Sequence, residues 1–149
     1  MLEGQQQLYQ ELILDHNSHP RNFGPLQQAT AQGVGDNPLC GDRIEVQVRV
    51  QDNQVVKVHF CGAGCAIAKA SASIMTEAVQ GKTTQQIEQL FNAFHALVKR
   101  QEHVPGVELG KLTVFAGVGK FPMRVKCATL AWHALRAALD QDGARQADG

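Results

Sequence analysis

Ile44-Glu-Val-Gln-Val-Arg-Val50 alternates apolar and polar residues without a break. It is followed by the polar turn Gln51-Asp-Asn-Gln54 and by a second apolar run, Val55-Val-Lys-Val-His-Phe60. Strict alternation predicts a strand with one buried and one solvated face. The residues of the second run that we expect to face inward are Val56, Val58 and Phe60. Two such runs joined by a short turn predict an antiparallel hairpin, around which the rest of the chain is interpreted.

Thiol and carboxylate side chains stand at the two open ends of this hairpin. Cys40 and Asp42 come just before the first strand, and Cys65 comes just after the second. An antiparallel pair puts these ends side by side. Cys40 and Asp42 also flank Gly41, and a tight turn at a glycine can aim a thiolate and a carboxylate at one point.

A third thiol, Cys127, ends the stretch Arg124-Val-Lys-Cys127. Like Cys65, it stands where an apolar helical pattern begins. A thiol at a helix start feels the positive end of the helix dipole and is expected to ionise more easily. Three thiols and one carboxylate make a complete tetrahedral zinc set, so the residues predict a metal site at Cys40, Asp42, Cys65 and Cys127.

Helical periodicity surrounds the hairpin on both sides. The spacing predicts an N-terminal helix over 5–16, a brief edge strand over 30–35 and a final helix that begins near Pro122. Between them we expect one helix over 66–78, a capped helix from Thr83 to about residue 100, and a short helix over 109–119. One domain is expected over 1–142. Segment 143–149 is expected to be disordered, because it has no apolar residue larger than alanine.

Composition narrows the class of protein. The chain has 149 residues, 44% of them hydrophobic, which suits one domain with a continuous core. Fourteen basic and fourteen acidic residues cancel, so the charge pattern argues against a nucleic-acid partner. No stretch approaches a membrane span or an export signal, and we expect a cytoplasmic protein with no membrane partner. In that compartment four cysteines favour metal binding or thiol chemistry over disulfides.

The histidines are not assigned to the metal site. His16 and His19 lie near the end of the first predicted helix, and we interpret them as caps or surface residues. His95 and His103 lie on or after the polar side of the helix that begins at Thr83, so we expect them to be solvated.

Four motifs together resemble the U-type iron-sulfur assembly proteins. They are Asp15-His-Asn-Ser-His-Pro-Arg-Asn-Phe-Gly24, Asn37-Pro-Leu-Cys-Gly-Asp42, Gly62-Ala-Gly-Cys-Ala-Ile-Ala68 with Ala70-Ser-Ala-Ser73, and Phe121-Pro-Met-Arg-Val-Lys-Cys-Ala-Thr-Leu-Ala-Trp132. The resemblance covers roughly residues 5–140 and is closer to the SufU branch than to the IscU branch. Segment 83–119 is long, as in SufU proteins, and Lys126 stands where IscU proteins carry a histidine ligand.

The resemblance implies an α+β fold, with a small antiparallel sheet and helices packed on it. It also implies that Cys40, Asp42, Cys65 and Cys127 bind zinc and that Cys40 accepts persulfide sulfur from a SufS-type cysteine desulfurase. Downstream iron-sulfur assembly proteins would be further partners. Cys61 departs from the family pattern, and we interpret it as a packing residue at a strand end, with a spare ligand or resolving thiol as the alternative.

Three functions compete at this point. The first is a zinc-dependent sulfur carrier resembling a sulfurtransferase, the second is a scaffold that holds a nascent iron-sulfur cluster, and the third is a structural zinc domain. A carboxylate such as Asp42 is a harder and more exchangeable zinc ligand than cysteine or histidine, which disfavours a purely structural site. Lys126 in place of a histidine favours the carrier over the scaffold. Cys40 lies in a loop, where a thiol can move, and is therefore the predicted sulfur acceptor.

Overall fold

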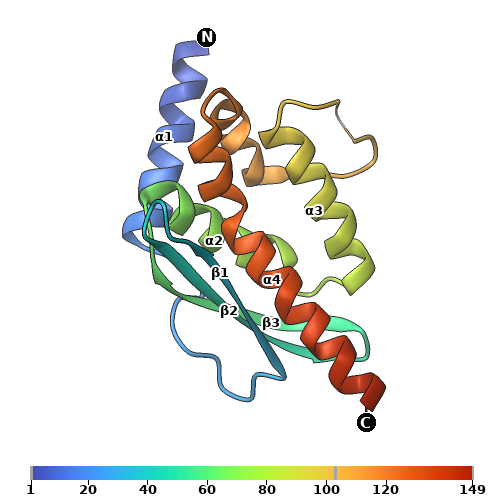
Figure 1. Ribbon diagram of the computed structural model, residues 1–149. Coiled ribbons are helices and arrows are strands. Elements are labelled where there is room, and N and C mark those ends of the chain that lie inside the picture. The colour runs from blue at the N-terminus through green and yellow to red at the C-terminus, as the bar shows by residue number, and fades with distance from the viewer. Residues whose placement is uncertain (1, 103, 149) are drawn as a thin grey trace.

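A computed structural model describes residues 2–102 and 104–148 of the chain. Within these ranges the element order is α1(Leu2–Ser18), β1(Ala31–Asn37), β2(Asp42–Gln51), β3(Gln54–Ala63), α2(Ala66–Val79), α3(Thr84–Val98), the 3-10 helix η1(Gly110–Lys120) and α4(Pro122–Asp148). The three strands form one antiparallel sheet with the order β1-β2-β3. The predicted α+β fold is confirmed (Figure 1).

The predicted hairpin is the β2–β3 pair. Its turn residues Asp52 and Asn53 have positive φ angles of 52° and 63°, the backbone that a two-residue hairpin turn requires. One inward residue was predicted wrongly. The pairing register shifts between Arg49 and Val50, so Val55 is fully buried and Val56 is only half-buried. A one-residue irregularity exchanges the faces of the residues beyond it.

Helices cover one face of the sheet. α4 packs on β1 and β2 and runs diagonally across them, while α2 packs on β3 and on α4 (Figure 1). β1 is the predicted edge strand, and α4 approaches it closely at two glycines. A Cβ atom added to Gly33 would overlap the carbonyl oxygen of Ala134, and one added to Gly35 would lie 2.7 Å from the Leu130 carbonyl oxygen. Only glycine allows this helix to lie so close to the sheet.

The capped helix from Thr83 forms as predicted. The Thr83 hydroxyl accepts from the Gln86 backbone N–H, and the Gln86 side chain accepts from the Thr83 N–H. α3 then contributes its apolar stripe to the core. The short helix predicted over 109–119 is present as the 3-10 helix η1.

α4 differs from expectation at both of its ends. It begins at Pro122, so Cys127 lies in its second turn and not at its start. It also continues to Asp148, where the sequence predicted disorder after residue 142. Alanine, arginine and glutamine are good helix formers, and extending an existing helix is much easier than starting one. The proposed domain boundary at residue 142 stays a prediction. In the described ranges no helix has the length and hydropathy to cross a membrane.

Candidate metal and sulfur site

Cys40 lies on the tight turn that joins β1 to β2. The turn is closed by a hydrogen bond from the Cys40 backbone N–H to the Asn37 carbonyl oxygen at 3.1 Å. Gly41 follows with a φ of 73°, the left-handed region that favours glycine. Asn37 and Asp42 face each other across the two strands at the base of this turn. The Cys40 side chain is exposed.

The Asp42 carboxylate occupies the centre of the site and is only 1% exposed. Its Oδ1 accepts a hydrogen bond from the Cys65 backbone N–H at 3.0 Å, and its Oδ2 accepts one from the Cys127 thiol at 3.2 Å. Across residues 7–102 and 104–144, whose side chains the structure describes, Asp42 forms no ion pair with a basic side chain. A buried carboxylate normally requires a paired cation, so Asp42 is placed to receive one.

The structure brings three of the four predicted ligands into one group. Ligand atoms of Cys40, Asp42 and Cys127 all lie within 4.8 Å of one another. Two ligands bound at about 2.3 Å to the same tetrahedral ion are about 3.8 Å apart, so small side-chain movements would complete the geometry. Thiolate sulfur and carboxylate oxygen are established zinc donors, and the residues fit such an ion.

Cys65 adjoins this group without being part of it. It is the N-cap residue of α2, and its Sγ accepts a hydrogen bond from the Ala68 backbone N–H at 3.4 Å. Its own backbone N–H contacts Asp42, and its thiol interacts with that of Cys127. Cys65 is therefore at a helix start, as predicted, and a rotation of its exposed side chain would add a fourth donor.

Cys127 does not have the environment that the sequence predicted. Burial raises the pKa of its thiol, and hydrogen bonding with Cys65 and Asp42 raises it further. The helix dipole acts mainly on the first turn, and Cys127 lies beyond it because α4 begins at Pro122. The expectation of easy ionisation is wrong for this residue, and a bound cation would favour its thiolate form.

The remaining cysteine, Cys61, lies on the opposite face of the sheet. It alternates with the buried Phe60, and its thiol contacts Glu45 Oε2 at 3.8 Å. Burial and the neighbouring Glu45 carboxylate raise the pKa of the Cys61 thiol. This placement fits the packing interpretation, and among the described residues Cys61 is not a member of the metal-site group. All four cysteines are unpaired in the structure.

Two histidines differ from their predicted surroundings. His19 is exposed beside Asp15, as expected, but His16 is fully buried and its Nδ1 lies 2.7 Å from Ser73 Oγ. The cause is the packing of α1 on α2, which encloses the ring. His95 is half-buried and stacks on Phe91, with ring centroids 4.3 Å apart, so its predicted solvation is wrong. His103 lies outside the described residues.

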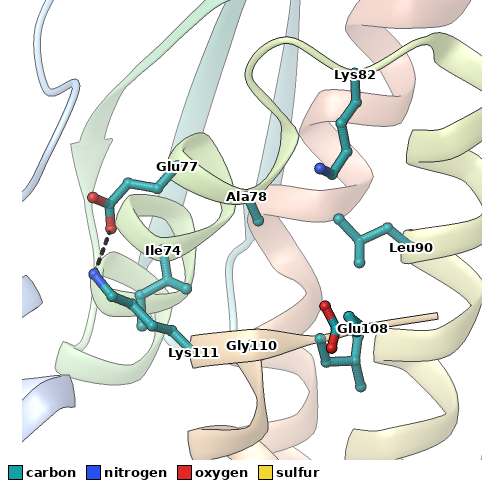
Figure 2. A pocket seen from close by; sticks show the side chains of 9 residues that line it. Ile74, Glu77, Ala78, Lys82, Leu90, Glu108, Gly110 and Lys111 are labelled. Atoms are coloured by element: carbon teal, nitrogen blue, oxygen red, sulfur yellow. Dashed lines mark hydrogen bonds and ion pairs between the residues drawn. The ribbon is translucent and has the colours of Figure 1, made fainter.

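A pocket of about 380 Å³ lies away from the thiols, between α2, α3 and the start of η1 (Figure 2). Its wall carries an ion pair between Lys111 Nζ and Glu77 Oε1 at 3.3 Å. The residues that line this pocket include neither a cysteine nor Asp42. The metal-site group, at the β1–β2 turn, is therefore a separate feature of the molecule.

The fold and the site together define a small α+β protein. A cluster of thiol and carboxylate groups lies at one end of its sheet and is able to hold a soft metal ion. Residues 8–128 match the family model described as "NifU-like N terminal domain". The chain belongs to this family.

Relatives carry both of the names that the resemblance suggested. The chain is 39% identical to "Iron-sulfur cluster assembly scaffold protein IscU" of Streptococcus pyogenes serotype M1, over 93% of this chain and 87% of that protein. It is 37% identical to "Zinc-dependent sulfurtransferase SufU" of Bacillus subtilis, over 91% of each chain. The crystal structure of a putative SufU scaffold protein from Fervidobacterium islandicum matches with a TM-score of 0.82 and 33% identity, over 89% of this chain and 97% of that one. The family is confirmed, and these identities do not separate its branches.

Sequence reasoning missed one polar group beside the site. Asn37 is 8% exposed, and its amide Nδ2 has no hydrogen-bond partner among the residues that the structure describes. The sequence places Asn37 next to the Pro-Leu-Cys-Gly turn. It does not indicate that the amide is buried, because this burial depends on α4, which packs over β1.

Proposed function

We propose that this protein accepts sulfur on Cys40 from a cysteine desulfurase and delivers it to iron-sulfur cluster assembly. In this proposal Cys40, Asp42, Cys65 and Cys127 hold one zinc ion, and the desulfurase is of the SufS type. The observation that carries the proposal is the contrast in exposure within the cluster. Cys40 is exposed on a turn, whereas Asp42 and Cys127 are 1% and 5% exposed and belong to packed elements.

Sulfur transfer needs a thiol that can leave the cluster and return. The Cys40 thiolate would attack the outer sulfur of the desulfurase persulfide, forming a new S–S bond. The bond within the donor persulfide breaks, and its electron pair leaves on the donor cysteine as a thiolate. The result is a persulfide on Cys40, with no net oxidation or reduction. Bound zinc would supply charge that keeps its cysteine ligands ionised.

The rest of the cluster is suited to remain in place during this exchange. Cys127 is packed within α4, and Asp42 is tied to both Cys65 and Cys127 by hydrogen bonds. Moving these groups would disturb packed elements, which resist such shifts. The β1–β2 turn can swing the Cys40 sulfur outward at Gly41 with less disturbance.

The scaffold function is the second candidate, because the same donors would also hold iron and sulfide. The name of the Streptococcus relative supports it, and the name of the Bacillus relative supports the carrier. Lys126 favours the carrier, since its exposed ammonium group cannot act as a ligand where a histidine could. Asp42 again disfavours a purely structural zinc site, because a carboxylate ligand exchanges more readily than cysteine.

A cytoplasmic location is part of the proposal. Four unpaired thiols, one of them needed for sulfur transfer, suit a reducing compartment. Balanced charge, with fourteen basic and fourteen acidic residues, supports a protein partner over a nucleic acid.

Persulfide trapping tests the proposal. Each single variant Cys40→Ser, Cys61→Ser, Cys65→Ser and Cys127→Ser is incubated with a SufS-type desulfurase and free cysteine, and alkylated products are located by peptide mass. We expect Cys40→Ser to abolish stimulation of the desulfurase and to leave no persulfide on the protein. Cys61→Ser is the matched control and should behave as the parent protein does. Sulfur that accumulates on Cys61 or Cys127 while Cys40 is present would refute the carrier mechanism.

A further inference from the structure

The Asn37 amide is a buried donor without an acceptor. The residue is 8% exposed, and its Nδ2 makes no hydrogen bond with any described residue. Buried polar groups are almost always paired, and leaving one unpaired is costly. An acceptor is therefore expected beside Asn37 when the protein is in its working state.

The position of Asn37 limits which acceptor this can be. Asn37 ends β1 directly across from Asp42, on the buried side of the sheet. Its own backbone carbonyl closes the turn that holds Cys40. Both Asp42 oxygens already accept hydrogen bonds, from the Cys65 N–H and the Cys127 thiol. Within the metal-site group, Cys40 Sγ is the ligand atom that has no hydrogen bond in the described part of the chain.

We infer that the Asn37 side chain donates an N–H···S hydrogen bond to the Cys40 sulfur when the site holds its metal ion. This inference rests on the proposed function. A neutral thiol is a weak acceptor, whereas a metal-bound thiolate carries negative charge and accepts strongly. Loading of the site would therefore supply the Asn37 donor with its acceptor. Asn37 is then a positioning residue, since it acts on the metal and on sulfur transfer only through Cys40.

Such a bond has two consequences for the site. It orients the Cys40 sulfur toward the ion, and it withdraws charge from that sulfur. Partners of metal ligands typically change metal affinity by about 10-fold to 100-fold when they are removed. We expect removal of the Asn37 amide to lower metal affinity by the same range. The hydrogen bond would be lost whenever Cys40 swings out to meet its partner protein.

Cobalt substitution tests the inference by spectroscopy. Co²⁺ is titrated into the metal-free parent, into Asn37→Leu, which keeps the side-chain volume without the donor, and into Asp36→Asn as the matched control. Asp36 is the preceding residue of β1 and is exposed on the other side of the strand. We expect the sulfur-to-cobalt charge-transfer band of Asn37→Leu to move to longer wavelength, because an unbonded thiolate gives up an electron more easily. The d–d bands of tetrahedral cobalt should stay in place, and affinity should fall at least about 10-fold.

A measurement on the unmodified protein covers the case in which Asn37→Leu fails to fold. The parent chain is labelled with ¹⁵N and loaded with ¹¹³Cd²⁺, and the Asn37 side-chain protons are followed by NMR. We expect one of them to shift on loading and to show a coupling to cadmium through the hydrogen bond. Asn37 protons that do not change on loading would overturn the inference, as would an unshifted charge-transfer band in a folded Asn37→Leu protein.

The outcomes separate this inference from the proposed function. A parent protein that binds cobalt through thiolates, alongside an Asn37→Leu variant with the same spectrum and affinity, refutes the role of Asn37 and leaves the zinc site standing. A parent protein that takes up neither cobalt nor cadmium refutes the metal site, and the inference falls with it.

Discussion

Asp42 Oδ2 accepts a hydrogen bond from the Cys127 thiol at 3.2 Å, which joins the first residue of β2 to the second turn of α4. The same carboxylate holds the start of α2 through the Cys65 N–H. One buried side chain therefore ties together three elements that contribute to the site. Its contribution to metal binding can be separated from its contribution to folding by choosing the replacement.

Replacing Asp42 should change zinc release more than it changes the fold. Asp42→Asn keeps an oxygen that can accept from the Cys65 N–H but removes the charge, whereas Asp42→Ala removes both. We expect faster zinc release from both variants, measured by stopped flow with a chromophoric chelator. Asp42→Ala should also lose about 1–3 kcal/mol of stability, because the Cys65 N–H is left without its acceptor. Release rates equal to those of the parent protein would show that Asp42 is not a ligand.

Removing zinc should lower the melting temperature of the protein by several degrees. An ion that binds the folded chain and not the unfolded chain adds its binding free energy to stability. Without the ion, the buried Asp42 carboxylate would also lose the cation proposed to compensate its charge. Calorimetry before and after chelation, with metal content verified, measures the change, and readdition of zinc should reverse it. An unchanged melting temperature would mean that binding and folding are not coupled.

Gly33→Ala should destabilise the protein through the contact between α4 and β1. The added methyl group would overlap the Ala134 carbonyl oxygen, a backbone atom that cannot move alone. Overpacking of this kind costs about 1–3 kcal/mol, measurable by urea unfolding. Gly143→Ala is the control, because its added methyl group meets nothing within 4 Å and lies within α4. That variant should be neutral or slightly stabilised, and equal losses in both variants would contradict the packing argument.

His95 should make stability depend on pH below neutrality. Burial is the main cause that lowers its pKa from the ordinary 6.5 to about 4, with His133 and Lys99 contributing. Between these two values the unfolded chain binds more protons than the folded chain, so stability falls as pH decreases from 6.5 to about 4. His95→Phe keeps the stacking on Phe91 and removes the titration. Urea unfolding at a series of pH values should show a shallower dependence for this variant, and identical slopes would contradict the assignment.

The parts of the fold that could be predicted are those set by local patterns. Alternation from Ile44 gave the hairpin, and the hairpin alone placed Cys40, Asp42 and the start of α2 at one end of the sheet. The Thr83–Gln86 capping box likewise marks a helix start from four residues. These features depend on short spacings, which a single sequence displays directly.

The parts that could not be predicted depend on contacts between distant segments. The shift that buries Val55 arises from pairing across the hairpin, and the burial of His16 arises from α1 against α2. The environment of Cys127 depends on where α4 begins and on Asp42, 85 positions away. The position of a residue in the chain indicates which side chains can meet. The charge and the solvent exposure around those side chains depend on how the whole chain packs.

If Cys40 carries sulfur as proposed, the short turn between Asn37 and Asp42 fixes how far that sulfur can travel. Both ends of the turn belong to paired strands, so the tether of Cys40 is only a few residues long. A thiol on so short an arm cannot search for its donor or recipient through solution. Each exchange partner must bring its own reactive sulfur or metal to the rim of the sheet, and a protein whose reactive group is recessed would be rejected by geometry even if it bound well. Delivery would thereby depend on direct hand-over between docked proteins.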